Sequence, residues 1–122
     1  MITRILATTV ALALLLVPGV VLAHAFLDHS DPAVGSTVPT SPDVMHLWFT
    51  QQLEPAFSTV TVTNQSGAAV NAAPAAIDPG NRSELDVKLN QLPAGTYKVK
   101  WHVLSVDTHT TEGSFSFHVG GK

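Results

Sequence analysis

The strongest constraint on the fold is an alternation of apolar and polar residues with a period of two. In residues 96–103, Tyr97, Val99, Trp101 and Val103 alternate with polar or basic neighbours. The same alternation occurs in residues 44–50, 58–64, 84–89 and 114–119. Because successive side chains of a strand point to opposite faces, this pattern predicts half-buried β-strands.

Turn signals separate these segments. They are combinations of Pro, Gly, Asp, Asn and Ser at residues 31–32, 39–42, 66–67, 78–81 and 93–95. No amphipathic helical pattern of useful length accompanies them. Short strands at this spacing predict an all-β fold, an Ig-like Greek-key β-sandwich of about seven strands. Residues 68–81 are rich in Ala and weakly patterned, so we expect a long loop or an irregular edge there.

Residues 1–23 have the features of a signal peptide. Arg4 supplies the positive charge, residues 11–17 form the apolar centre, and Val21-Leu22-Ala23 resembles a cleavage site. An uncleaved membrane anchor is the alternative, although Thr8, Thr9, Pro18 and Gly19 interrupt the apolar run. We therefore expect two parts, a signal peptide over 1–23 and one exported domain over 24–122.

The exact cleavage point decides whether His24 is retained. A cut after Ala23 makes His24 the first residue of the mature chain. Residues 23–25 also form an A-x-A pattern, and a cut after Ala25 would remove the histidine. Sequence rules alone favour the first site.

Composition excludes several classes of function. Without Arg4, the 6 Lys and Arg residues fall to 5 against 9 acidic residues, a net charge of −4, which does not suit nucleic-acid binding. The chain has no cysteine, so disulfides, thiolate metal sites and Cys nucleophiles are excluded. No pattern resembles a catalytic nucleophile with its base, so we expect a binding protein and not an enzyme.

Three residues carry the candidate chemistry: His24, Asp107 and His109. In extended chain, residues i and i+2 point the same way, so the Asp-x-His spacing projects a carboxylate and an imidazole together. If the mature N-terminus lies beside them, the α-amine, two imidazoles and the carboxylate form a set of three nitrogens and one oxygen, which suits Cu(II). The alternative is an Asx-type turn at Asp107 with an exposed imidazole.

The other histidines have simpler interpretations. His46, His102 and His118 alternate with the apolar residues of their segments, so we expect them to face solvent. His29 lies five residues from His24 and is kept as a candidate accessory ligand.

Residues 30–50 (SDPAVGSTVPTSPDVMHLWFT) and 94–119 (AGTYKVKWHVLSVDTHTTEGSFSFHV) resemble the CopC family of copper-binding proteins of the bacterial periplasm. The resemblance extends over residues 24–122. It implies a Greek-key β-sandwich and one Cu(II) per chain, held by the N-terminal histidine with its amine and by the D-x-H pair. In this chain these ligands would be His24, Asp107 and His109, and the resemblance favours cleavage after Ala23.

The chain departs from the family pattern at two places. Some members carry a Cu(I) site in a Met-rich loop, but residues 66–82 here contain no Met and no His. Thioether ligands are what Cu(I) prefers, so we expect no such site. An acidic residue that some members have after the L-x-F strand is Gln51 here, and Glu54 is an uncertain substitute.

The resemblance implies a periplasmic Cu(II) carrier or buffer in copper homeostasis and resistance. A membrane copper transporter of the CopD kind would be its partner, and no membrane span would remain after signal cleavage. Two alternatives stay open. One is a copper oxidase or oxygenase with a histidine brace, and the other is a metal-free Ig-like interaction module.

Overall fold

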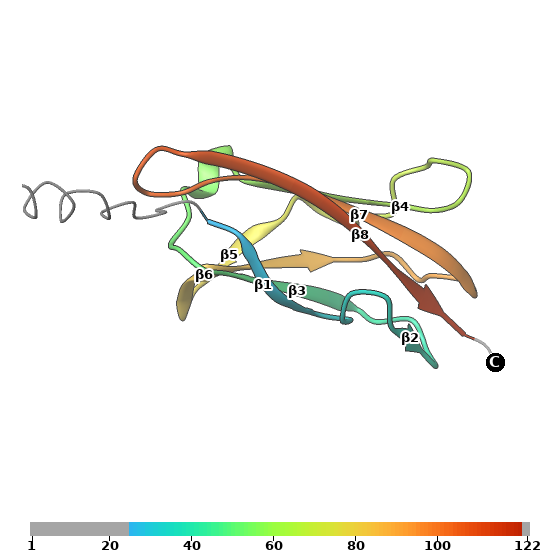
Figure 1. Ribbon diagram of the computed structural model, residues 1–122. Helices are drawn as coiled ribbons and strands as arrows, with labels where there is room; N and C mark the ends of the chain where they lie inside the picture. Colours follow the sequence, from blue (N-terminus) through green and yellow to red (C-terminus); the bar gives the residue numbers. More distant parts are fainter. Residues whose placement is uncertain (1–24, 121–122) are drawn as a thin grey trace, which may run out of the picture.

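The computed structural model describes residues 25–120, which form two four-stranded sheets packed face to face (Figure 1). The first sheet has the order β1-β3-β6-β5 and the second has the order β2-β8-β7-β4. The strands are β1 Leu27–Asp31, β2 Thr37–Val38, β3 Val44–Phe49, β4 Thr59–Thr63, β5 Ala76–Asp78, β6 Asn81–Lys88, β7 Gly95–Leu104 and β8 Thr110–Val119. A short 3-10 helix, η2, spans Pro55–Phe57.

The predicted sandwich is confirmed. The chain crosses from one sheet to the other at every connection from β1 to β5, and again between β6 and β7. These crossings give the Greek-key connectivity, and the two long strands β7 and β8 form the central hairpin of the second sheet. In the described residues no helix is long and apolar enough to cross a membrane.

Three of the eight strands were not predicted, namely β1, β2 and β5. Strand β1 buries Ser30 at its inward position, and β2 is a two-residue parallel pairing with the end of β8. Strand β5 lies inside the Ala-rich segment 68–81, where isolated bridges at Ala69 and Asn71 provide the remaining pairing. That segment is the irregular edge that the sequence predicted.

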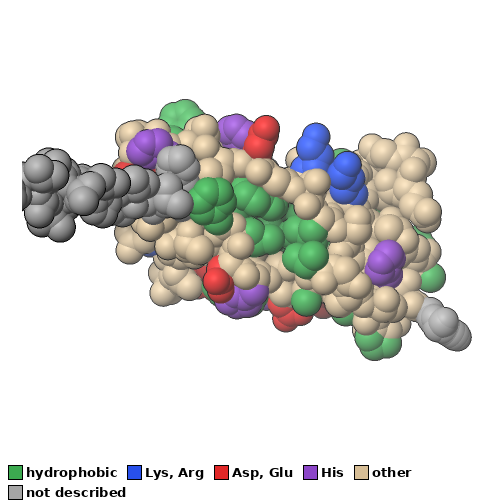
Figure 2. Space-filling model, in the orientation of Figure 1, with side chains coloured by type: hydrophobic (Ala, Val, Ile, Leu, Met, Phe, Trp, Pro, Cys, Tyr) green, Lys and Arg blue, Asp and Glu red, His purple; other side chains and the backbone are tan. Residues whose placement is uncertain are grey.

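The core lies between the two sheets. Figure 2 shows apolar side chains in a band along the edge between the two layers, with charged side chains above and below it. The predicted inward residues of β7 are confirmed, because Tyr97, Val99, Trp101 and Val103 are all at most 8% exposed. Trp101 meets Phe49 of the opposite sheet edge to face, with ring centroids 5.3 Å apart.

Gly113 in β8 is required by Trp101. The two residues are cross-strand partners, and a Cβ on Gly113 would lie 2.5 Å from Cζ2 of the indole. The buried ring cannot move away without disturbing the core, so we expect Gly113→Ala to lower the free energy of unfolding by about 1 to 3 kcal/mol. Urea denaturation measures this effect.

Gly80→Ala is the matched control for Gly113→Ala. A Cβ on Gly80 would meet only the Asp78 carboxylate, at an ordinary contact distance of 3.4 Å. We expect this variant to stay within about 0.5 kcal/mol of the parent protein. Equal stability of the two variants would contradict the proposed role of Gly113.

Candidate metal centre

The β7–β8 loop, residues 105–109, carries the predicted Asp-x-His pair. The Ser105 N–H donates to the His109 carbonyl at 2.9 Å, and the Thr108 N–H donates to the Ser105 carbonyl at 2.9 Å. Thr108 has a φ of 74°, in the left-handed region that β-branched residues rarely adopt. The loop is therefore a closed turn and not the extended strand end from which the sequence argument started.

The turn nevertheless brings the two predicted side chains together. Nδ1 of His109 lies 3.3 Å from Oδ1 of Asp107, and both side chains are partly exposed. The Ser105 hydroxyl donates to Oδ1 of Asp107, and this hydrogen bond, with a smaller contribution from His109, lowers the pKa of Asp107. The loop thus presents an ionised carboxylate beside an imidazole. The hydrogen bond also fits the alternative of a local turn at Asp107.

The residues after His24 are fixed beside this loop. Ala25 is fully buried, and its carbonyl accepts a hydrogen bond from the Thr111 hydroxyl, two residues beyond His109. The next residue, Phe26, exchanges hydrogen bonds of 2.9 Å with Thr50 through its N–H and its carbonyl. His24 and the predicted signal peptide lie outside the described residues.

The segment after β3 also packs against the loop. The Val106 N–H donates to the Gln52 carbonyl at 3.0 Å, and Leu53 forms an isolated bridge with Ser105. The Glu54 N–H donates to the Leu104 carbonyl at 2.8 Å at the end of β7. Gln51 directly precedes these residues and therefore belongs to a segment in direct contact with the β7–β8 loop.

The remaining histidines lie on the strands. His29, the candidate accessory ligand, stacks on Trp48 with ring centroids 4.3 Å apart, and its Nδ1 lies 2.6 Å from a carboxylate oxygen of Asp28. His102 is exposed on the outer face of the second sheet, as predicted. His118 alternates with the buried Phe117 and Val119 and so faces outward as predicted, but it is half-buried there and pairs with the Thr96 hydroxyl at 2.9 Å.

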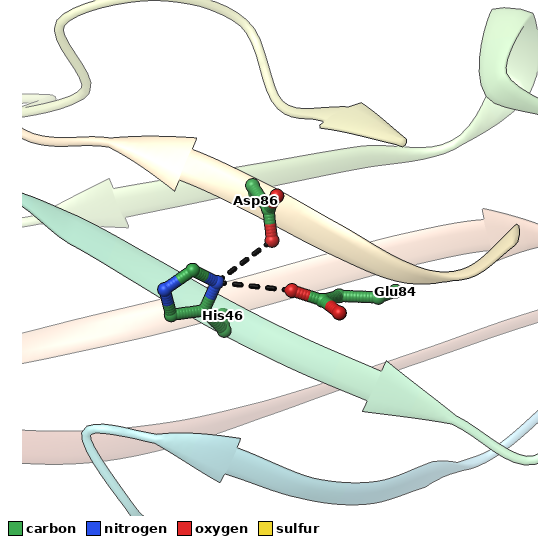
Figure 3. A group of neighbouring side chains, drawn as sticks. All are labelled: His46, Glu84 and Asp86. Atoms are coloured by element: carbon green, nitrogen blue, oxygen red, sulfur yellow. Dashed lines mark hydrogen bonds and ion pairs between the residues drawn. The ribbon is translucent and has the colours of Figure 1, made fainter. Parts of the chain in front are cut away.

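Sequence reasoning missed a cluster formed by His46, Glu84 and Asp86. Nδ1 of His46 lies 3.0 Å from Oε2 of Glu84 and 2.8 Å from Oδ1 of Asp86 (Figure 3). His46 faces outward as predicted, but its side chain is only 35% exposed and is bound on both sides by carboxylates. The alternation in residues 44–50 and 84–89 predicted that all three side chains face outward. The sequence did not show, however, that these two strands pair with each other.

The crowding of carboxylates shifts the ionisation of the cluster. Partial burial raises the pKa of Asp86 to about 6, with a further contribution from the Glu84 carboxyl. Partial burial lowers the pKa of His46, but the hydrogen bonds and charges of Asp86 and Glu84 outweigh it and raise the value overall. The cluster therefore holds protons more tightly than its isolated groups would.

Comparison with known proteins identifies the family. The CopC domain matches residues 27–120. Protein YobA of Escherichia coli K12 is 38% identical over 113 residues, which cover 89% of this chain and 91% of YobA. Copper resistance protein C of Xanthomonas campestris pv. juglandis is 36% identical over 123 residues, which cover 95% and 96% of the two chains.

A solved structure agrees with these relatives. The crystal structure of CopC from Methylosinus trichosporium OB3b superimposes with a TM-score of 0.74 at 33% identity, over 79% of this chain and 93% of that one. The likeness therefore holds for the sequence and for the arrangement of the two sheets, over nearly the whole of the described residues. The chain belongs to the CopC family.

Proposed function

We propose that this protein is a periplasmic Cu(II) carrier or buffer that acts in copper homeostasis and resistance. One Cu(II) per chain would be bound by the α-amine and imidazole of His24, the imidazole of His109 and the carboxylate of Asp107. The observation that carries the proposal is the Asp107–His109 pair, 3.3 Å apart, with Ala25 bound to Thr111 next to it. Relatives with names such as copper resistance protein C support copper as the metal that is bound.

The donor set fits Cu(II) chemically. Imidazole, amine and carboxylate ligands suit the tetragonal geometry of Cu(II). The Ser105 hydroxyl keeps Asp107 ionised, so this ligand carries no proton that the metal must displace. The amine and the Nδ1 atom of His24 would close a six-membered chelate ring, which lowers the entropy cost of assembling the site.

A carboxylate that completes the plane around copper favours carriage over catalysis. Little room remains for a substrate or for oxygen at the metal, so we infer a binding protein and not an oxidase or oxygenase. A membrane copper transporter of the CopD kind is the partner we infer for delivery. The β7–β8 loop, where Asp107 and His109 are partly exposed, is the surface through which the ion would be exchanged.

Export and metal binding are linked in this proposal. Residues 1–23 would direct the chain to the periplasm, and cleavage after Ala23 would create the α-amine ligand of the domain 24–122. The uncleaved precursor would lack that amine, so the copper site would be completed only after export.

Asp107→Asn and His109→Gln test the site. Each substitution removes one ligand while preserving the size of the side chain, so we expect each to weaken Cu(II) binding by at least about tenfold. Competition with a Cu(II) chelator at one equivalent of copper measures the affinity. His102→Gln is the matched control, because His102 is exposed on the outer face of the second sheet.

The control protein should bind Cu(II) as the parent does, and circular dichroism should show that all three variants remain folded. Parent-like affinity in both Asp107→Asn and His109→Gln would exclude the proposed ligand set. Absence of tight Cu(II) binding by the parent protein itself would instead favour the metal-free interaction module.

A further inference from the structure

We propose that His46, Glu84 and Asp86 form a second metal site, separate from the copper centre, that binds a divalent first-row cation such as Zn²⁺. One nitrogen and at least two carboxylate oxygens would come from the protein, and water would complete the coordination. This ligand class binds Zn²⁺ in proteins. The site would lie on the outer face of the first sheet, on strands β3 and β6.

The distances already approach those of a coordination shell. The His46 nitrogen lies 2.8 and 3.0 Å from the two carboxylate oxygens, and one ligand atom from each of the three residues lies within 4.8 Å of the others. With metal–ligand bonds of about 2.0 to 2.2 Å, neighbouring ligands are separated by about 3.0 Å in an octahedron and about 3.4 Å in a tetrahedron. A cation could thus replace the proton shared with Nδ1 after small side-chain movements.

The excess negative charge of the carboxylates near His46 also favours binding of a cation. Asp78 lies within hydrogen-bonding reach of Asp86, so a third acidic group adjoins the two carboxylates that contact His46. Among residues 25–120, the ion pairs recorded for Glu84 and Asp86 are both with His46, and none involves Lys or Arg. Even a protonated His46 leaves this half-buried group negative, and a dication would neutralise the excess.

The scaffold holds the ligands in place. His46 is the direct cross-strand partner of Asp86, and Trp48 is the partner of Glu84, so the three ligands project from two paired strands. The Trp48 indole N–H donates to Oε1 of Glu84 at 2.9 Å and leaves Oε2 facing His46. Indirect support of this kind orients carboxylate ligands in metal sites.

Trp48 is itself fixed by stacking. Its ring stacks on that of His29, with centroids 4.3 Å apart, and contacts that of His46, with centroids 5.7 Å apart. The side chains of His46 and Asp86 remain 35% and 23% exposed, which leaves an open side for water ligands and for entry of the ion. None of these residues belongs to the β7–β8 loop, so the two sites share no ligand.

The test uses Zn²⁺ alone and a protein whose copper ligands are disabled. In the processed His24→Gln/Asp107→Ala/His109→Ala protein, equilibrium dialysis should show saturable binding of one Zn²⁺ per chain. Adding His46→Gln should weaken this binding by at least about tenfold, and Trp48→Phe should weaken it by about tenfold because Glu84 loses its support. His102→Gln in the same background should leave the Zn²⁺ affinity unchanged.

A second measurement locates the ion independently of any substitution. Zn²⁺ should shift the ¹⁵N resonance of Nδ1 of His46 by an amount typical of coordination, and it should not shift the His102 resonances. Absence of saturable Zn²⁺ binding would overturn the proposal, and so would an unchanged affinity in both His46→Gln and Glu84→Gln/Asp86→Asn. The outcome is independent of the Cu(II) titrations, because none of those alters His46, Trp48, Glu84 or Asp86.

Discussion

A Gly-Pro dipeptide added ahead of His24 is expected to weaken Cu(II) binding by at least about a hundredfold, or about 2.8 kcal/mol. The extension converts the α-amine of His24 into an amide and so removes one ligand together with the chelate ring that it closes. Every side chain of the domain stays in place. The effect therefore isolates the free N-terminus from the other three proposed ligands.

Proline is chosen because it lacks an N–H. A single added glycine would provide a new amine and a deprotonable amide next to His24, and these could form a different Cu(II) chelate. With Gly-Pro, the nitrogen preceding His24 cannot bind the metal in this way. Native mass spectrometry with one equivalent of Cu(II) and competition titration would measure retention and affinity.

Two comparisons make the experiment decisive. His24→Gln with a free amine should also bind Cu(II) more weakly than the parent, and combining it with the Gly-Pro extension should add little. Affinity of the parent should fall on acidification, since an α-amine with a pKa of about 7.7 to 8.0 must lose its proton to bind. Parent-like binding by the extended protein would show that the N-terminus is not a ligand.

The fold was predictable wherever burial alternates along the chain. Residues 96–103 could be predicted to form a strand because Tyr97 and Trp101 enter the core while Lys98 and His102 stay exposed. Strand β1 was missed because its inward residue is Ser30, whose hydroxyl donates to the Pro32 carbonyl at 2.8 Å instead of packing as an apolar side chain. A search for alternating apolar and polar residues does not detect a strand whose buried position is polar.

The closeness of the two ligand side chains in the candidate site could be predicted from the sequence, but the backbone conformation of the loop could not. The proximity of Asp107 and His109 followed from their separation by one residue, but the turn that produces it depends on hydrogen bonds of Ser105 and on the left-handed Thr108. The cluster around His46 depends on the pairing of β3 with β6, whose sequence separation is about forty residues. The local sequence of β3 or of β6 does not indicate which strand will be its neighbour in the sheet.

The second prediction with a large effect is the loss of bound copper when Cu(II) is reduced to Cu(I). Anaerobic reduction of the Cu(II)-loaded protein in the presence of a Cu(I) chelator is expected to transfer all of the copper to the chelator. The proposed ligands are nitrogen and oxygen donors, which favour Cu(II), whereas Cu(I) prefers thiolate and thioether sulfur. Spectrophotometry of the Cu(I)–chelator complex measures the transfer.

The distribution of sulfur in the chain is the reason for this expectation. There is no cysteine, and the two methionines are Met1 and Met45. Met45 is 0% exposed between the sheets, so its thioether is not available to an ion in solution. Met1 belongs to the predicted signal peptide and would be absent from the mature protein, and residues 66–82 add no Met or His.

Met45→Leu provides the matched control for Cu(I) binding. Because the substitution nearly conserves the volume of a core side chain, the variant should fold and should release Cu(I) as completely as the parent. Cu(I) retained by the parent against the chelator would contradict the prediction, and loss of that retention in Met45→Leu would identify the sulfur responsible. Complete release from both proteins would mean that no site on this chain holds Cu(I) against an acceptor, so reduction beside a Cu(I)-binding partner would suffice for delivery.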